Sequence, residues 1–333
     1  MLLTNAKIII LIEYIMKLEN KGLLAFEWAT LAYVVFTLVV MAVLWPRLLC
    51  PWDMLAGRAG VVATTLVLWG VYRRWPSRFT MLLRAVGQML WLSWWYPDTY
   101  ELNRCLPNLD HVFASAEQWL FGCQPALTLC QQWPQPFVSE PLALGYVSYY
   151  PLIAAVFIYY FLRRYDEFAS CVYVILGSFF LFYVIFVLLP VAGPQFYYEA
   201  VGTDVIAQGH FPDIGHYFYD HQESLPIPGK AGGFFYQLLQ QAHDAGERPT
   251  AAFPSSHVGV TTVLMWLAWH SRSRLLFFAM LPLAVLMFFA TFYIQAHYVI
   301  DAIAGLVVGT AMYFALARGD FFSKRHGSFK KNM

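Results

Sequence analysis

Eight apolar runs along this chain are each long enough to be considered as a membrane helix: 28–45, 59–72, 79–96, 143–162, 168–189, 257–270, 275–294 and 298–316. Crossing the hydrocarbon core of a bilayer takes about 20 residues of α-helix, and fewer where polar groups face a cavity. The runs 59–72 and 257–270 are short, and 79–96 contains Arg84 and Gln88, so these three meet the criterion less well. The pattern predicts an all-α polytopic membrane protein with about eight transmembrane helices.

The composition excludes most soluble classes. Hydrophobic residues make up 59% of the 333-residue chain and charged residues only 12%, whereas a soluble domain carries roughly 25% charged residues. The formal net charge of +1 provides no basic excess for binding nucleic acid. No CxxC pair occurs, and the histidines of the longest loop follow no known ligand spacing, so we expect neither a metal site nor a cofactor.

The Lys and Arg side chains indicate how the chain is oriented. If the N-terminus is cytoplasmic, fifteen of them fall in inner segments and five in outer segments. The inner ones are Lys7, Lys17, Lys21, Arg73, Arg74, Arg78, Arg163, Arg164, Arg272, Arg274, Arg318, Lys324, Arg325, Lys330 and Lys331; the outer ones are Arg47, Arg58, Arg104, Lys230 and Arg248. This bias is the positive-inside pattern, so we predict that both termini are cytoplasmic. It suits a bacterial inner membrane and leaves a Golgi-type membrane open.

Three regions follow from this topology. Residues 1–78 hold a segment that we expect to lie along the membrane surface, followed by two helices. Residues 79–317 form the main membrane domain, and 318–333 form a basic cytoplasmic tail. No small-residue cleavage site follows the first apolar stretch, so we expect no removable signal peptide. Two long outer loops, about 97–142 and 190–256, are rich in Pro, Gly and aromatic residues, and the second has a net charge of −5.

The densest chemical signal lies at the outer ends of the sixth and eighth runs. Pro254-Ser255-Ser256-His257 opens one helix, whose first free N–H groups, with Ser255 and Ser256, form an anion site. His257 stands in its first turn and is placed to donate a proton to a leaving oxygen. His297 and Asp301 are four residues apart, so we expect them on one helical face, with the carboxylate orienting the imidazole. An anion site, an acid and an oriented nucleophile together indicate phosphoester transfer through a phosphohistidine.

A single histidine in an apolar segment is more often a packed polar residue than a catalyst. Ionisable groups in membrane helices are nevertheless costly, and each is a functional candidate. Here His257, His297 and Asp301 occur at matching depth beside a Pro-Ser-Ser-His turn, and that combination favours catalysis.

These two motifs resemble the second and third motifs of the type 2 phosphatidic acid phosphatase (PAP2) superfamily of lipid phosphatases and phosphotransferases. The resemblance implies a six-helix core, formed here by the third to eighth runs, with the first motif at 190–198 (PVAGPQFYY). It also implies that His297 is the nucleophile, His257 the acid and Asp301 the acidic partner.

The departures from the phosphatase pattern point to one branch. The phosphatases carry a Lys and an Arg in the first motif and an Arg six residues before the nucleophile. This chain has no cation near GPQFYY, Thr291 in place of that Arg, and Ser256 in place of a Gly. The triad and the segments around 109–111 and 119–125 are most similar to the inositol phosphorylceramide synthase group, which belongs with the sphingomyelin synthases. The resemblance covers about residues 96–316.

A phosphate still needs cations, and few are available. The candidates are Lys230, Arg248, Arg104 and Arg84, with Arg248 the first choice because it lies six residues before Pro254. Gln195, Tyr197 and Tyr198 are candidate donors to a phosphate or headgroup; the alternative is a belt of interfacial aromatic residues.

The sequence therefore predicts a membrane lipid phosphotransferase with its active site on the extracytoplasmic face, moving a headgroup such as inositol phosphate onto an acceptor such as ceramide. Its partners would be membrane lipids, and its oligomeric state stays open. The first alternative is a phosphatase acting on lipid phosphates or polyprenyl diphosphate. The second is a transporter or a non-catalytic scaffold, although no inverted repeat of broken helices is visible.

Overall fold

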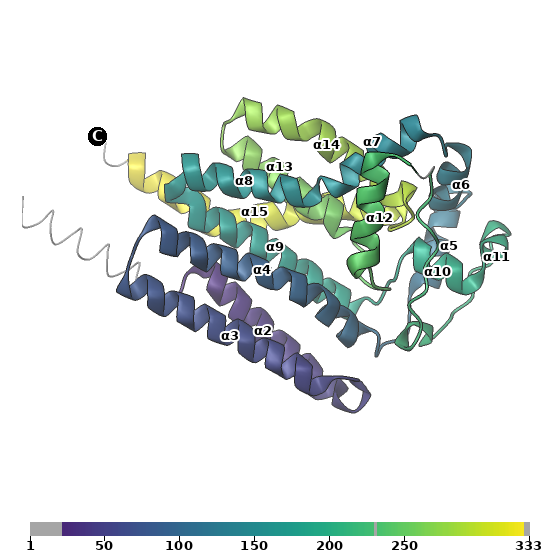
Figure 1. Ribbon diagram of the computed structural model, residues 1–333, viewed down its shortest axis with the longest axis horizontal. Coiled ribbons are helices and arrows are strands. Elements are labelled where there is room, and N and C mark those ends of the chain that lie inside the picture. Colours follow the sequence, from purple (N-terminus) through teal and green to yellow (C-terminus); the bar gives the residue numbers. More distant parts are fainter. Residues whose placement is uncertain (1–21, 230–231, 330–333) are drawn as a thin grey trace, which may run out of the picture.

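The computed structural model describes residues 22–229 and 232–329, and all regular secondary structure within those ranges is helical. The predicted surface segment at the N-terminus and Lys230 lie outside these ranges. Each of the eight apolar runs coincides with a helix or a pair of helices, which confirms the all-α fold class. The long helices lie along the long axis of the molecule, and shorter ones gather at one end (Figure 1).

The long helices are α2 (Ala25–Leu44), α3 (Pro51–Arg74), α4 (Arg78–Asn103), α8 (Tyr149–Arg163), α9 (Phe168–Leu188), α13 (Ser256–His270), α14 (Arg274–Tyr293) and α15 (Val299–Phe329). Within the described ranges, five spans, starting at Ala25, Pro51, Tyr165, Arg274 and Val299, are long and apolar enough to cross a membrane by length and composition. Helix α13 has 15 residues, short for a full crossing.

The predicted run 143–162 is not one straight helix. It divides between α7 (Pro136–Val147) and α8, which meet at an angle of 43°. Pro151, in the first turn of α8, has no N–H to donate to the Val147 carbonyl, which accounts for the break. Counted as one bent span, this pair raises the number of candidate spans to six.

Helix α9 forms the centre of the bundle. It packs against α2, α4, α8, α13 and α15. Most of its side chains are buried, including Phe182, Phe186 and Ser178, while Leu181 and Leu188 are exposed. A helix that is apolar all round is expected at such a central position, and here it joins the N-terminal helices to the rest of the chain.

Two buried ion pairs hold α2, α3 and α4 together. Arg84 of α4 pairs with Glu27 of α2, and Arg58 of α3 pairs with Asp98 of α4 at 2.7 Å; all four side chains are almost fully buried. Each of the four charges has its partner on a neighbouring helix, so none of them is left unpaired in an apolar environment.

Helices α13 and α15 approach until their backbones touch. A Cβ on Gly309 would overlap the Gly259 carbonyl, and one on Gly305 would overlap the Ser255 carbonyl. Gly305 and Gly309 are four residues apart, the small-residue spacing that lets membrane helices pack closely. The outer end of α13 is thereby brought against the start of α15.

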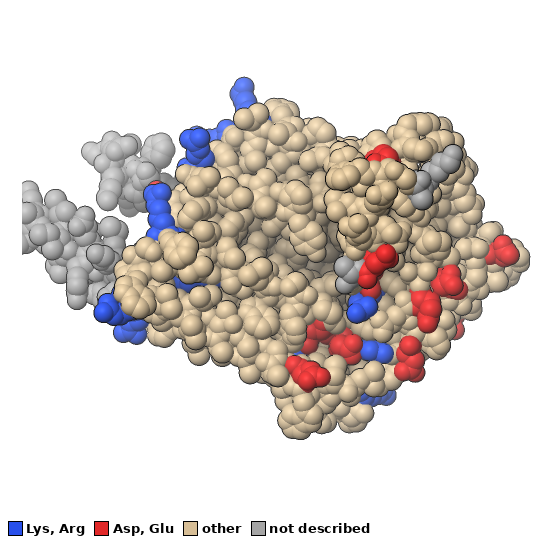
Figure 2. Space-filling model, viewed as in Figure 1, with Lys and Arg blue, Asp and Glu red and all other residues tan. Residues whose placement is uncertain are grey.

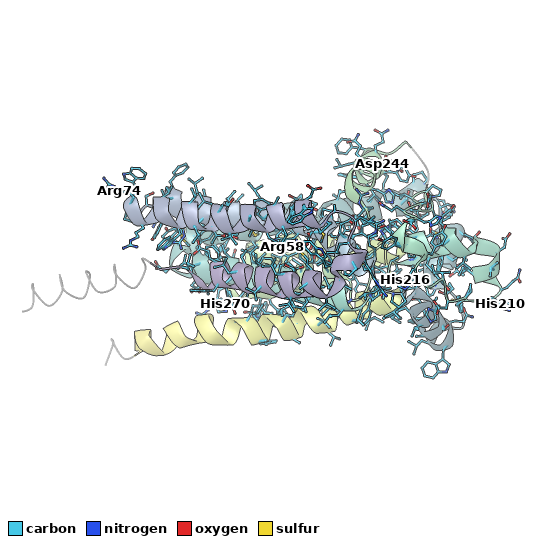
Figure 3. The ribbon with its side chains drawn as sticks, turned by 90° about the horizontal axis from the view of Figure 1, so that it is seen from below. Arg58, Arg74, His210, His216, Asp244 and His270 are labelled. Carbon is cyan, nitrogen blue, oxygen red and sulfur yellow. The ribbon has the colours of Figure 1, made fainter. Side chains whose placement is uncertain are left out.

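The two long loops, 97–142 and 190–256, contain short helices that the hydropathy pattern did not reveal: α5 (Asp110–Phe121), α6 (Pro125–Gln132), α10 (Pro194–Val201), α11 (Thr203–Ala207) and α12 (Phe234–Gly246). Short 3-10 turns lie at Trp45–Arg47, Tyr165–Glu167 and Tyr217–Tyr219. On the face seen in Figure 2, many exposed Lys and Arg gather at the opposite end from these helices, while Asp and Glu, with a few Lys and Arg, lie among them. In Figure 3, Arg74 and His270 lie toward the basic end, and His210, His216 and Asp244 lie at the other.

Candidate active site

The nucleophile candidate His297 lies in a turn, not on a helix. Helix α14 ends at Tyr293 and α15 begins at Val299, so the prediction that His297 and Asp301 share a helical face is wrong. The reason is backbone geometry: Gln295 has a φ of 65°, which ends the helical path, and the His297 N–H donates to the Thr291 carbonyl. His297 is nonetheless 4% exposed and fixed in orientation.

A backbone carbonyl orients the His297 ring. Its Nδ1 lies 2.8 Å from the carbonyl oxygen of Ala252. Because that oxygen can only accept, Nδ1 carries the proton and Nε2 presents its lone pair. Burial lowers the pKa of His297 to about 4, against the raising effect of the Ala252 hydrogen bond, so the ring is neutral and nucleophilic near neutral pH.

Asp301 lies close to His297 without a hydrogen bond between them. Its Oδ2 is 3.9 Å from His297 Nδ1 and accepts the Tyr298 N–H at 2.8 Å. Its Oδ1 is buried and has no partner among the described residues. A carboxylate at this distance can stabilise positive charge on His297 electrostatically, while Ala252 has the orienting role that the sequence pattern assigned to Asp301.

His257 faces the free nitrogen of His297. Its Nδ1 lies 3.4 Å from His297 Nε2, and the two ring centroids are 5.6 Å apart. The ring packs against Tyr146 and Tyr149, with centroid distances of 4.5 and 4.6 Å. A phosphorus attacked by His297 would therefore lie beside His257, the position required of a proton donor to the leaving oxygen.

The Pro-Ser-Ser-His turn opens α13 as the sequence predicts. Ser255 is the N-cap, and its hydroxyl accepts the Val258 N–H at 3.4 Å. The Ser255 N–H donates to the Asp301 carbonyl at 3.0 Å, which ties α13 to α15. Ser256 is the first residue of the helix, so the N-terminal N–H groups of α13 surround His257.

The first motif is joined to the other two through the backbone. Ala252 N–H donates to the Val191 carbonyl, and Gln195 N–H donates to the Gln295 carbonyl. Gly193 has a φ of 96°, and a Cβ there would overlap the Ala296 carbonyl, so only glycine fits beside the turn that carries His297.

Sequence reasoning did not identify Asp110 as a site residue. This fully buried carboxylate accepts hydrogen bonds from the Ala192 and Gly193 N–H groups at 2.6 and 2.8 Å. It also accepts from Asn108 Nδ2 at 2.6 Å and from the Tyr298 hydroxyl at 3.1 Å. Burial raises the pKa of Asp110, against the lowering effect of these donors. The sequence signal was the similarity around 109–111, which indicated a shared segment but not its role.

Glu117, on the same helix, was also missed. Its Oε1 accepts the Val299 N–H at 2.6 Å, at the first residue of α15, and its Oε2 is buried without a partner among the described residues. Burial raises the pKa of Glu117 to about 7. Helix α5 thus places one carboxylate on the first motif and another at the start of α15.

The residues predicted to contact a phosphate or headgroup have different partners in the structure. Tyr198 is fully buried, and its hydroxyl donates to Gln124 Oε1 at 2.9 Å. Tyr197 donates to the Pro212 carbonyl at 2.8 Å. Gln195 is buried, and its backbone joins the first motif to the His297 turn.

Among the cation candidates, Arg84 and Arg104 are already paired with Glu27 and Glu101. Arg248 is partly exposed, and its guanidinium donates to the Glu247 carbonyl at 3.4 Å. Of the three candidates in the described part of the chain, Arg248 is the one that forms no ion pair with a carboxylate, and it stays our first choice as a phosphate ligand.

Taken together, a bundle of membrane-length helices holds two facing histidines, His257 in the first turn of α13 and His297 just before α15, an arrangement suited to phosphoester chemistry in a membrane. The comparison with protein families agrees: a family model described as PAP2 superfamily matches residues 111–315, and the chain belongs to that superfamily. The match begins in α5 and includes all three motifs, close to the 96–316 expected from the sequence. No curated protein and no solved structure gives a significant match.

Proposed function

We propose that this protein is a membrane lipid phosphotransferase that moves a phospho-headgroup, such as inositol phosphate, from a glycerolipid onto a lipid hydroxyl such as that of ceramide. The observation that carries the proposal is the histidine pair: His297 Nε2 faces His257 at 3.4 Å, while Ala252 holds the proton on Nδ1. Superfamily membership supports phosphoester chemistry on lipids, and the choice of donor and acceptor is our inference.

The proposed cycle has two displacement steps at phosphorus. In the first, His297 Nε2 forms a bond to phosphorus, the bond from phosphorus to the diacylglycerol oxygen breaks, and His257 gives that oxygen a proton. Asp301, 3.9 Å from Nδ1, stabilises the positive charge on the phosphorylated ring. In the second, His257 takes the proton of the acceptor hydroxyl, whose oxygen binds phosphorus as the N–P bond breaks. Both histidines return to their starting states.

The charge around the site favours a phosphodiester donor over a phosphate monoester. Asp110, Glu117 and Asp301 are all buried close to the histidine turn, whereas the cations of the phosphatase pattern are missing. A dianionic monoester would meet more repulsion here than a diester with one negative charge. This supports headgroup transfer over hydrolysis of phosphatidic acid.

The phosphatase remains the second candidate, because the same cycle with a lipid phosphate or polyprenyl diphosphate as donor and water as acceptor releases inorganic phosphate. Phosphatidylinositol labelled at phosphorus, incubated with the purified protein with and without ceramide, separates the two. Our proposal expects a labelled ceramide product only when ceramide is present. Release of label into water at the same rate without ceramide would instead establish hydrolysis.

The catalytic assignment is tested with His297→Ala in the same assay. Loss of the nucleophile should lower the rate by about 10⁴-fold or more, because no other group can form the covalent intermediate. His270→Ala, at the opposite end of α13, is the matched control and should keep wild-type activity. Acid-labile label trapped on residue 297 would support the intermediate, whereas full activity of His297→Ala would exclude His297 as the nucleophile. A wild-type protein without activity on any lipid phosphoester would instead favour the transporter or scaffold alternative.

A further inference from the structure

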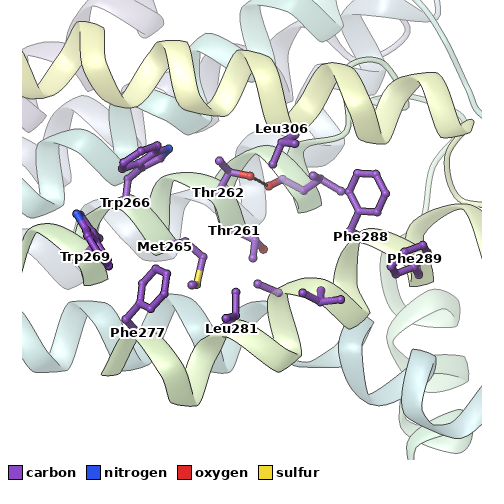
Figure 4. Close-up of a pocket in the computed structure, with 13 residues that line it drawn as sticks. Thr261, Thr262, Met265, Trp266, Trp269, Phe277, Leu281, Phe288, Phe289 and Leu306 are labelled. Carbon is purple, nitrogen blue, oxygen red and sulfur yellow. Dashed lines mark hydrogen bonds between the residues drawn. The ribbon is translucent and has the colours of Figure 1, made fainter. Parts of the chain in front are cut away.

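A long apolar groove runs between α13 and α14, with one wall residue from α15. Its volume is about 740 Å³, and hydrocarbon groups dominate its lining (Figure 4). Residues facing it include Thr261, Thr262, Met265, Ala284, Val285 and Leu306. All belong to helices that form the membrane bundle, so water is not the natural occupant of this groove.

The groove begins next to the catalytic histidine. Val258 lines it and directly follows His257 in α13. From Val258 to Trp269 the helix rises roughly 16 Å, at about 1.5 Å per residue. That length is close to one leaflet of a hydrocarbon core about 30 Å thick. A chain lying in the groove could therefore extend from the site to the middle of the bilayer.

One polar group inside the groove has no partner. Thr261 lies one helical turn beyond His257, is 3% exposed, and its Oγ1 makes no hydrogen bond with any described residue. Its neighbour Thr262 differs, because its hydroxyl donates to the Val258 carbonyl at 2.8 Å. In Figure 4, Thr261 points into the space between α13 and α14. A buried hydroxyl left unpaired in this way points to a ligand with a polar group at that depth.

The far end of the groove is closed by aromatic rings. Trp269 and Phe277 pack edge to face at 5.2 Å between centroids, and both also line a second hollow nearer the basic end of the bundle. The two rings therefore lie where the groove and the second hollow meet, and they limit how far a chain can extend.

We infer that this groove holds a hydrocarbon chain of the lipid substrate, with a carbonyl or amide group of that lipid bonded to Thr261 and the Trp269–Phe277 pair setting the longest chain that fits. The inference rests on the proposed function, since it places the reacting phosphoester at His257 and His297. It assigns selectivity for chain length to side chains outside the catalytic motifs.

The test compares dioctanoyl with dipalmitoyl phosphatidylinositol as donors for the purified full-length protein in mixed micelles. Val285→Trp puts an indole into the groove and should lower kcat/KM for the dipalmitoyl lipid about tenfold, with little change for the dioctanoyl lipid. Val67→Trp, the same change on the exposed face of α3, should leave kcat/KM for both lipids unchanged. Phe277→Ala removes part of the closed end and should shift preference toward longer chains, whereas Phe79→Ala, on α4, should not.

The hydroxyl is tested separately. Thr261→Val keeps the side-chain shape and should raise KM for both lipids several-fold. Thr30→Val is the control and should not change KM, because the Thr30 hydroxyl is bonded within α2 and does not line the groove. If Val285→Trp and Phe277→Ala leave the ratio of kcat/KM for the two lipids unchanged, or lower both values equally, the groove assignment is overturned. The proposed function still stands in that case if His297→Ala is inactive. Activity retained by His297→Ala overturns the proposed function instead.

Discussion

Asp110 joins three segments that are far apart in the sequence. Its carboxylate accepts hydrogen bonds from two backbone N–H groups of the first motif and from the hydroxyl of Tyr298, the residue after the nucleophile candidate. Glu117, two turns further along α5, fixes the first N–H of α15. Neither side chain reaches the histidine pair in any described contact. Both therefore act as positioning residues, holding the turn that carries His297.

Glu117 should make stability depend on pH. Its pKa is raised by burial from 4.5 to about 7, so folding favours the protonated form. The stabilising contribution is fully present below about pH 4.5 and is lost as pH rises through 7. A shift of that size corresponds to about 3 kcal/mol. Glu117→Gln keeps an acceptor for the Val299 N–H and removes the charge, so the variant should be more stable than wild type at about pH 8.

The measurement is the thermal midpoint of both proteins in detergent at about pH 5 and about pH 8. From about pH 5 to about pH 8, the thermal midpoint of the wild type should fall clearly more than that of the Glu117→Gln variant. Parallel changes in the two proteins would show that Glu117 is not the titrating group.

At the scale of helices, the hydropathy pattern was a good guide inside the membrane and a poor one outside it. Apolar runs such as 168–189 and 275–294 correspond to α9 and α14. A segment surrounded by lipid or protein has no water to bond its backbone groups, so it forms a helix. Helices α5, α6 and α12 are short and partly polar, so their positions depend on packing that a linear pattern does not contain. The His297 turn was missed for a related reason, since a positive φ at Gln295 leaves no signature in residue spacing.

The close approach of α13 and α15 makes a prediction for the site. Gly309→Leu should force the two helices apart, because a Cβ there overlaps the Gly259 backbone, which cannot yield as a flexible side chain can. Moving His257 away from His297 by about 1 Å should lower activity about 10²-fold. Gly70→Leu is the matched control: this glycine of α3 has open space around it, so activity should be retained.

Activity assays and circular dichroism of both variants make the comparison. A folded Gly309→Leu protein with wild-type activity would mean that the glycine contact does not set the geometry of the site.

For the whole molecule, the two ends of the bundle carry different charge. Arg73 and Arg74 end α3, and Arg272 lies in the turn between α13 and α14, all at one end of the bundle. His257, at the opposite end of α13 from that turn, and the acidic loop lie at the other end. Under the positive-inside rule, we expect the basic end in the cytoplasm and the site outside.

Cysteine labelling in intact cells checks this orientation. In a chain whose five free cysteines are replaced, Gln222→Cys should react with a membrane-impermeant maleimide, and Arg272→Cys should react only after the membrane is opened. Both positions are exposed, so accessibility depends on the side of the membrane. The reverse pattern would place the active site in the cytoplasm.

The pairing of Arg84 with Glu27 and of Arg58 with Asp98 has a consequence for biogenesis. All four charges belong to the first three long helices, which are synthesised before any catalytic residue. A nascent chain that has emerged as far as Asn103 already contains both partners of each pair, so these buried charges need no partner from later segments. These three helices then offer α9 a preassembled surface on which to insert.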